Sequence, residues 1–129
     1  MCIRDRRYRL HPDHRHAGFL TVDGVVAARD PHFFPEQALP HHRPAALLLF
    51  EADEPDHVEP AGEAAVAAKL AALEAHRSQL RSTMHVEVGT PEAAAQMAAF
   101  HTRVRDRLAA HGALAGLPMG EAFKAITDL

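Results

Sequence analysis

The longest strongly apolar run in the chain reads Ala45-Ala46-Leu47-Leu48-Leu49-Phe50 and lies between Pro44 and Glu51. Apolar and polar residues do not alternate within it. This pattern favours a strand that is buried on both faces, as in a parallel sheet covered by helices, with a short buried helix as the alternative. A lone strand cannot form a sheet. Because the sequence predicts no second buried strand, we expect the partner strands to lie outside this chain.

A helix is expected on the N-terminal side of this run, over residues 13–29. Pro12 suits a helix start because its missing N–H is not needed there, and Asp13 in the first turn complements the helix dipole. Three residues with helical spacing form one apolar face of this helix: Phe19, Val22 and Val26.

Residues 30–44, between this helix and the strand, are expected to form a loop. The segment contains Pro31, Pro35, Pro40 and Pro44, and proline forbids regular structure at such a density. Phe33 and Phe34 lie inside the segment, and we expect their rings to pin the loop to the core.

A second helix is expected over residues 62–80, after an acidic, proline-containing loop at 51–60. Its buried stripe is predicted to consist of Val66, Leu70, Leu73 and Leu80. Arg77 also falls into this stripe. It is either a paired buried arginine or a sign that the end of the helix has left the core.

The C-terminal third of the chain predicts a long helix. Residues 81–89 precede it with an alternation of Met84, Val86 and Val88, which fits an edge strand or an extended loop. Thr90 is expected to cap the helix with Pro91 at its first position, and Gly112 to end it. Its apolar face comprises Ala93, Met97, Phe100, Val104 and Leu108. The tail contains residues 121–126, predicted as one or two helical turns.

The composition excludes several classes of protein. The chain has 129 residues, 47% of them hydrophobic, which is one domain or less. It has 14 basic and 17 acidic residues and a net charge of −3, so it lacks the excess of basic residues that is typical of nucleic-acid-binding proteins. No apolar run approaches the ~18 residues that cross a bilayer, and no signal-peptide core follows the start. We therefore expect a cytoplasmic protein. A single cysteine, Cys2, excludes an internal disulfide and a Cys-rich zinc module.

The 11 histidines are the unusual feature of the composition. The sharpest group is His11-Pro12-Asp13-His14, in which two imidazoles flank a carboxylate at a helix start. Neutral imidazole is the commonest metal ligand, and a neighbouring carboxylate can orient a ligating histidine. The alternative is that His11 caps the helix entry and His14 is an exposed helix residue, in a chain whose coding bias enriches histidine throughout.

Four blocks of sequence together resemble the C-terminal half of the PIG-L (LmbE-like) N-deacetylase family. They occur in order over residues 11–80 and read His11-Pro-Asp-His-Arg15, Ala27-Ala-Arg-Asp-Pro-His-Phe-Phe-Pro35, Leu48-Leu-Phe-Glu-Ala-Asp-Glu-Pro-Asp-His57 and Lys69-Leu-Ala-Ala-Leu-Glu-Ala-His-Arg-Ser-Gln79. The resemblance is weaker from Pro91 onwards.

The resemblance implies the C-terminal portion of a Rossmann-like three-layer α/β fold, helix-rich and with an incomplete parallel sheet. It also implies a zinc-dependent hydrolase that removes acetyl groups from a small-molecule amino-sugar conjugate. By the resemblance His14 is a zinc ligand, His11 stabilises the oxyanion or protonates the leaving amine, and Asp13 supports them from the second shell. Zinc would activate the attacking water and polarise the amide carbonyl.

The chain departs from the family pattern at one essential point. The family's N-terminal Ala-His-Pro-Asp-Asp-Glu motif, which carries two zinc ligands and the general base, does not occur in it. Residues 1–10 read as a non-native or disordered start, and Met1–Arg6 resembles a translated sequencing adapter. We therefore expect residues 11–129 to be the C-terminal part of one deacetylase domain. We also expect this chain alone to be inactive and to bind no tight zinc.

The remaining candidate residues favour structural roles. Asp56 and His57 fit a structural or substrate-rim loop, and His76 a partly buried residue that packs its helix. His41 and His42 form a solvated pair with a minor chance of adventitious metal binding. The arginines of the last long helix, Arg103, Arg105 and Arg107, are expected to form a solvated surface.

Two other functions compete with the deacetylase. One is a small, alanine-rich helical interaction module that docks on a partner through the apolar faces of its two C-terminal helices. The other is a histidine-rich metal-binding protein without hydrolysis. The sequence leaves the oligomeric state and the exact substrate open.

Overall fold

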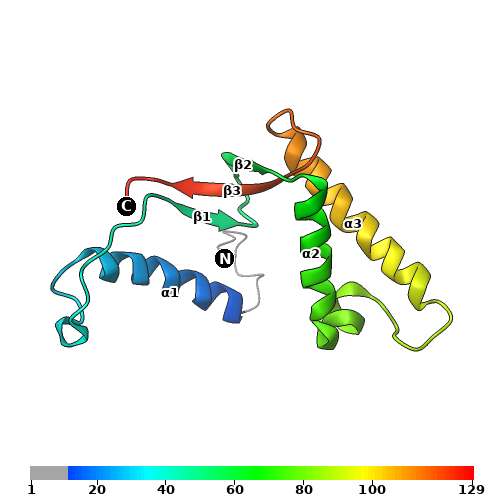
Figure 1. Ribbon diagram of the computed structural model, residues 1–129, viewed down its shortest axis with the longest axis horizontal. Helices are drawn as coiled ribbons and strands as arrows, with labels where there is room; N and C mark the ends of the chain where they lie inside the picture. The colour runs from blue at the N-terminus through cyan, green and yellow to red at the C-terminus, as the bar shows by residue number, and fades with distance from the viewer. Residues whose placement is uncertain (1–11) are drawn as a thin grey trace. The chain divides into compact units, whose positions relative to one another are not determined.

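The computed structural model describes residues 12–129 (Figure 1). The chain divides into two compact units, one formed by the residues up to His57 together with Ala122–Leu129 and the other by Val58–Glu121. Its helices and strands are α1 (Pro12–Arg29), β1 (Leu47–Phe50), β2 (His57–Pro60), α2 (Glu63–Ala75), α3 (Ala93–Ala113) and β3 (Gly120–Ile126).

Helix α1 confirms the predicted helix and begins one residue earlier than expected, with Asp13 in its first turn and Arg29 in its last. The predicted apolar face is wrong, because Phe19 is 53% and Val26 41% exposed. The covered side is rotated: Gly18 is buried, and Val22 is half-buried. Glycine has no side chain, so the face of α1 that contains Gly18 allows the closest packing. Phe19 and Val26 lie on other faces of the helix and remain exposed.

The predicted loop after α1 is confirmed, with a single 3₁₀ turn at Pro35–Gln37. Its aromatic residues do not pin it to the core as expected, since Phe33 is 50% and Phe34 55% exposed. Their rings contact each other instead, tilted by 55° with centroids 6.1 Å apart. Phe34 has a left-handed backbone (φ 51°) where it enters the 3₁₀ turn.

The sheet has three strands in the order β1-β3-β2. Strand β1 confirms the strand predicted around Leu47–Phe50, but its partner β3 runs antiparallel, with Leu47 opposite Ile126 and Phe50 opposite Phe123. The expectation of a parallel sheet is therefore wrong for the described strands, and one partner strand comes from this same chain. Strand β1 is also not buried on both faces, since only Leu49 is fully buried.

Two segments predicted without strands contribute to this sheet. The 51–60 segment is a loop only as far as His57, where β2 begins. The predicted helical turn at 121–126 is wrong, because Gly120–Ile126 is β3. Glu121 to Ile126 has a composition that favours helices, but pairing with β1 satisfies its backbone and buries Ala122, and such tertiary context overrides a weak local preference.

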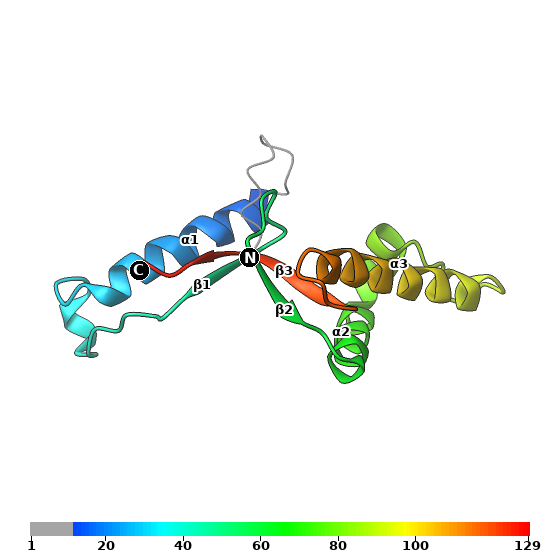
Figure 2. The same ribbon diagram turned by 90° about the horizontal axis from the view of Figure 1, so that it is seen from above.

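In the second unit, α2 and α3 pack against each other (Figure 2). Two clusters form the core, one around Val66, Leu70 and Leu108 and the other around Leu80, Met84, Val86 and Phe100. The apolar stripes predicted for both helices are thus confirmed. Helix α2 ends at Ala75 rather than at 80, and it is followed by a 3₁₀ turn and one π-helical turn. Arg77 is exposed, so the second of its two interpretations is right.

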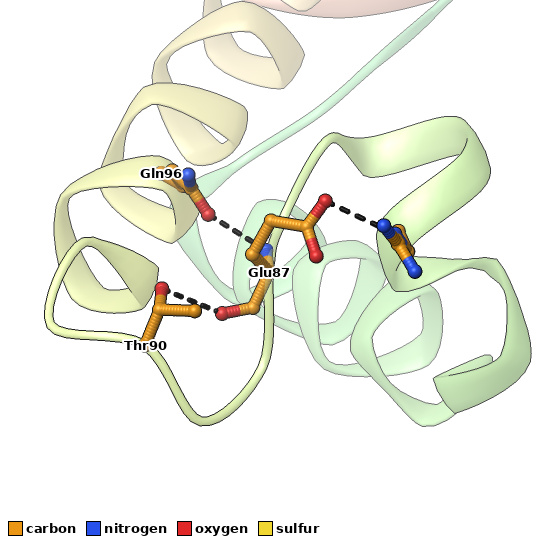
Figure 3. Close-up of polar contacts among 4 residues, drawn as sticks. Glu87, Thr90 and Gln96 are labelled. Carbon is orange, nitrogen blue, oxygen red and sulfur yellow. Dashed lines mark hydrogen bonds and ion pairs between the residues drawn. The ribbon is translucent and has the colours of Figure 1, made fainter.

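The turn into α3 is held by side chains that the sequence pattern did not single out. Thr90 does not cap α3; its hydroxyl donates to the Glu87 carbonyl at 2.9 Å. The Glu87 N–H donates to the Gln96 side-chain oxygen at 2.7 Å, and Arg81 bonds the Glu87 carboxylate at 3.0 Å (Figure 3). Met84 and Val86 are buried while Val88 is 72% exposed. Neither the edge strand nor the extended loop predicted for residues 81–89 describes the whole segment, because its first part, to Met84, belongs to the π-helical turn and only the rest is a loop.

Helix α3 does not end at Gly112 as predicted. It continues to Ala113, and the left-handed residue that follows the helix is Gly116, with φ 69°. Gly112 has another role. A Cβ at this position would lie 2.7 Å from the Leu117 carbonyl oxygen and 2.8 Å from the Met119 backbone. The chain that leaves α3 thus folds back directly over Gly112, which guides it towards β3.

Candidate functional site

The motif at the start of α1 is described from Pro12 onwards, and the predicted catalytic residue His11 lies outside the described residues. Asp13 and His14 both lie in the first turn of α1, and both are exposed. An exposed imidazole at a helix start is accessible to a metal ion or a substrate.

The described residues do not form a zinc site by themselves. A structural or catalytic zinc needs at least three protein ligands, and no group of three or more His, Cys, Asp or Glu side chains among residues 12–129 is arranged to hold a metal. His14 can supply one ligand, and Asp13 is close enough in sequence to support it. The other ligands would have to come from residues that this structure does not describe.

Asp56, singled out for its place in Pro55-Asp56-His57, has a structural role. One of its carboxylate oxygens accepts a hydrogen bond from the Ala125 N–H at 2.8 Å, and the other pairs with the Lys124 ammonium. The Asp56 N–H donates to the Phe123 carbonyl at 3.0 Å. The hydrogen bond from Ala125 and the nearby Lys124 charge lower the pKa of Asp56 below its ordinary value of 3.8. Asp56 therefore holds the loop before β2 onto β3 as a carboxylate.

We expect the contacts of the Asp56 carboxylate with Lys124 and Ala125 to weaken in acid. The pKa of Asp56 is lower in the folded than in the unfolded chain, so its contribution to stability is present above the unfolded pKa and is lost as the pH falls through the folded pKa. Comparing urea unfolding of the wild type and Asp56→Asn should show a constant destabilisation from neutral pH down to about pH 4, shrinking below it. A difference that does not change down to pH 2 would show that the carboxylate charge is not involved.

A cavity of about 440 Å³ lies at the opposite end of α1. Its lining includes Ala28, Phe33, Phe34 and Leu39, with His41 and His42 as polar neighbours. The His42 N–H donates to the Ala28 carbonyl at 2.7 Å and closes the loop around it. At 1.5 Å per residue, roughly 21 Å of helix separates Ala28 from His14, so this cavity is not part of the site around the histidine motif.

The other histidines are placed mostly as surface residues. His41 and His42 are exposed, as predicted. His76 is exposed rather than partly buried, which corrects the expectation; its N–H donates to the Leu73 carbonyl at the end of α2. The backbone of His76 is not helical (φ −77°, ψ 61°). Its side chain therefore does not continue the buried face of α2.

The second unit contains polar clusters that sequence reasoning missed. Glu121 pairs with Lys69 and lies 3.5 Å from the His111 ring nitrogen, with all three side chains about two-thirds buried. Glu74 contacts His101 at 2.6 Å. These partners are far apart in sequence, and Glu121 was assigned to a helical turn, so no local signal could have joined them. They tie α2, α3 and β3 together.

The arginines of α3 lie largely at the surface, as predicted, with Arg103 and Arg107 exposed and Arg105 half-buried. The Arg103 guanidinium donates to the Met84 carbonyl at 2.8 Å and lies over the Phe100 ring, 5.8 Å from its centroid. Arg105 forms an ion pair with Glu63 at 3.1 Å. Both side chains therefore also make contacts within the second unit while they remain at its surface.

The fold of this chain is similar to that of a solved protein structure. No protein-family model and no curated protein sequence matches the chain. Among solved structures, the chain matches N,N'-diacetylchitobiose deacetylase from Pyrococcus horikoshii, complexed with its inhibitor MPG, with a TM-score of 0.66 and 23% sequence identity. The fold is similar to part of a deacetylase. This structural match confirms the resemblance to the PIG-L deacetylases at the level of the fold.

The match covers nearly all of this chain but less than half of the deacetylase. It covers 94% of this chain but only 42% of the deacetylase chain, so the similarity concerns part of a larger fold. The coarser prediction of a mixed α/β fold matching part of a deacetylase is thereby confirmed. No helix among residues 12–129 is both long and apolar enough to cross a membrane.

Proposed function

We propose that this chain is the C-terminal part of a zinc-dependent N-deacetylase domain that removes an acetyl group from an N-acetylated amino-sugar substrate. The observation that carries the proposal is the match of nearly the whole chain to a solved carbohydrate deacetylase. The His-Pro-Asp-His motif at the start of α1 supports it, because it places an accessible imidazole at one end of a helix.

In this proposal each residue of the motif has a separate task. His14 supplies one zinc ligand, Asp13 orients the ligating imidazole, and His11 stabilises the oxyanion or protonates the leaving amine. Bound zinc would supply an activated water and a polarised carbonyl. Because the described residues hold no group of three metal ligands, the remaining ligands and the general base belong to a part of the domain that precedes α1.

The test compares two proteins. One is the 129-residue chain, and the other is the extended gene product, defined as the protein encoded when the same reading frame is continued upstream of codon 7. With zinc and N,N'-diacetylchitobiose, we expect acetate release from the extended gene product, lost on treatment with a chelator and restored by zinc. The chain alone should release none above the blank.

Two outcomes would count against the proposal. Acetate release by the 129-residue chain would show that the missing motif is not needed. An upstream reading frame without a second cluster of histidine and acidic residues would remove the source of the other zinc ligands. Hydrolysis of an N-acetyl group yields one free amine for each acetate, so measuring the amine with an amine-reactive dye alongside acetate distinguishes N-deacetylation from acetate released by a contaminating esterase.

The competing functions are less well supported by the structure. The apolar stripes of α2 and α3 were expected to dock on a partner in the interaction-module hypothesis, but they pack on each other around Val66, Leu70 and Leu108. The metal-binding hypothesis rested on the 11 histidines of the chain, with His11 and His14 or His41 and His42 as the binding pair. Metal titration of variants of each pair would decide which pair binds.

A further inference from the structure

The loop that follows α1, residues 30–42, forms most of the wall of the cavity at this end of the helix (drawn in cyan in Figure 1). The His42 N–H donates to the Ala28 carbonyl at 2.7 Å and joins the end of the loop to the helix. Prolines fix further backbone angles within the loop, at Pro31, Pro35 and Pro40. The cavity is therefore largely formed before a ligand enters, which lowers the entropic cost of binding.

Two residues of this loop have a left-handed backbone conformation. Phe34 and Ala38 both have φ 51°, and they flank the 3₁₀ turn at Pro35–Gln37. Residues that carry a Cβ rarely adopt this conformation, and those that do cluster at active sites and ligand-binding sites. The side chain of Phe34 gains no burial in return, since it is exposed. The loop therefore keeps a costly shape without burying this ring, as expected where the shape serves binding.

Two aromatic rings form an apolar corner of the cavity wall. Phe33 and Phe34 are both exposed, and their rings are tilted by 55° with centroids 6.1 Å apart. Leu39, also exposed, adds to the same lining. Exposed apolar groups that gather in one place mark binding sites. The faces of aromatic rings also attract cations within about 6 Å of the ring centroid, and the spacing of the two rings allows one cation to lie within that range of both.

The polar groups of the lining favour a positively charged ligand. Asp30 supplies a half-buried carboxylate. Its Oδ1 atom accepts a hydrogen bond from the His32 N–H at 2.8 Å, and its other oxygen has no partner among residues 12–129. The neutral imidazole of His42 has one nitrogen that accepts a hydrogen bond. The described residues that line the cavity include no lysine or arginine, so the charge of the lining complements an ammonium group.

We propose that this cavity binds a small organic ammonium ion with an apolar ring body. The ammonium group donates hydrogen bonds to the Asp30 carboxylate and the His42 imidazole, and the ring body packs against Phe33 and Phe34. The volume of about 440 Å³ lies within the range of small-molecule sites, and it suits a ring better than the thin alkyl chain of a lysine from a partner protein. The site lies at the other end of α1 from His14 and does not depend on the proposed function.

Ring compounds that differ only in their polar group test this proposal on the 129-residue chain. The probes are cyclohexylmethylammonium, cyclohexylmethanol and cyclohexanecarboxylate, and binding is followed by ¹H–¹⁵N NMR spectroscopy. The ammonium compound should shift the amide resonances of residues 24–42 with a Kd on the order of 1 mM. The alcohol should bind at least about 3-fold more weakly, and the carboxylate more weakly still. Equal affinities for the ammonium compound and the alcohol, or no saturable shift in this segment, would overturn the proposal.

Substitutions in the lining separate the effect of charge from that of shape. Asp30→Asn keeps an oxygen for the His32 N–H but removes the charge, so it should weaken binding of the ammonium compound by about 3–5-fold and leave binding of the alcohol unchanged. Phe33→Leu keeps an apolar side chain but removes a ring, and should weaken binding of the ammonium compound by about 2–5-fold. Phe19→Ala removes an exposed ring outside the lining and should change neither affinity. Full affinity in both lining variants would contradict the proposal.

A lysine derivative distinguishes a free small molecule from the side chain of a partner protein. N-acetyl-lysinamide carries the same ammonium group on a thin alkyl chain, and it should bind more weakly than cyclohexylmethylammonium. Binding at least as tight would assign the cavity to a lysine of a partner and refute the small-molecule ligand. None of these titrations involves acetate release. A failure to bind the ammonium compound therefore leaves the deacetylase proposal standing, and an inactive extended gene product leaves this one standing.

Discussion

Replacing His14 by alanine in the extended gene product is expected to abolish zinc-dependent acetate release. His14 is the ligand that this chain contributes in the proposed function, and an open zinc site with only two remaining protein ligands loses both affinity and geometry. We expect a loss greater than the roughly 10–100-fold caused by removing an outer-shell partner. The measurements are kcat/KM and the zinc content of the purified protein.

Two further variants make this result specific. Asp13→Asn keeps the shape of the side chain but weakens its hold on the imidazole, so activity should fall by about 10–100-fold. His41→Ala removes an exposed histidine near the other end of α1 and should change neither zinc content nor activity. Since His14 is exposed, circular dichroism of His14→Ala should be unchanged. Full zinc content and activity in that variant would refute its role as a ligand.

Replacing Gly112 by alanine should destabilise the second unit by about 1–3 kcal/mol, the usual cost of overpacking. A Cβ at Gly112 would lie 2.7–2.8 Å from backbone atoms of Leu117 and Met119, and backbone yields less readily than the end of a flexible side chain. Helix propensity alone predicts the opposite sign, because alanine is favoured over glycine inside a helix by about 1 kcal/mol. The direction of the change therefore distinguishes the two effects.

Gly24→Ala is the matched control for this prediction. Gly24 also lies within a helix, α1, but nothing is found within 4 Å of a Cβ at that position. The variant should be neutral or more stable by up to about 1 kcal/mol. Each kcal/mol corresponds to a shift in Tm of ~2–8 °C over the usual range of domain sizes, so thermal unfolding resolves the difference. Equal effects of the two substitutions would show that the close approach at Gly112 does not limit packing.

The helices were predictable because their signals are local. Val66 and Leu70 recur at helical spacing on α2, as Val104 and Leu108 do on α3, and the structure buries Val66, Leu70 and Leu108. Pro12 and Asp13 mark the start of α1 within one residue. The position of the His-Pro-Asp-His motif at this helix start could likewise be read from the sequence, because capping and dipole effects depend only on neighbouring residues.

The misassigned segments share a different cause. Residues 121–126 resemble a helix in composition but form β3, since a short segment adopts the structure in which its backbone finds partners. The role of Asp56 depends on Lys124 and Ala125, which lie far along the chain. The rotation of α1, which leaves Phe19 exposed, depends on what packs against the helix rather than on its own pattern.

By itself, the sequence determined where the three long helices lie, that a strand follows Pro44, and that Asp13 and His14 lie at the start of the first helix. These features depend on contacts between residues a few positions apart. Only the tertiary structure decided that the C-terminal segment is a strand antiparallel to β1, and that the backbone of Leu117 and Met119 passes close to Gly112. Those outcomes depend on which distant segments meet, and the free energy of such contacts is not encoded in local periodicity.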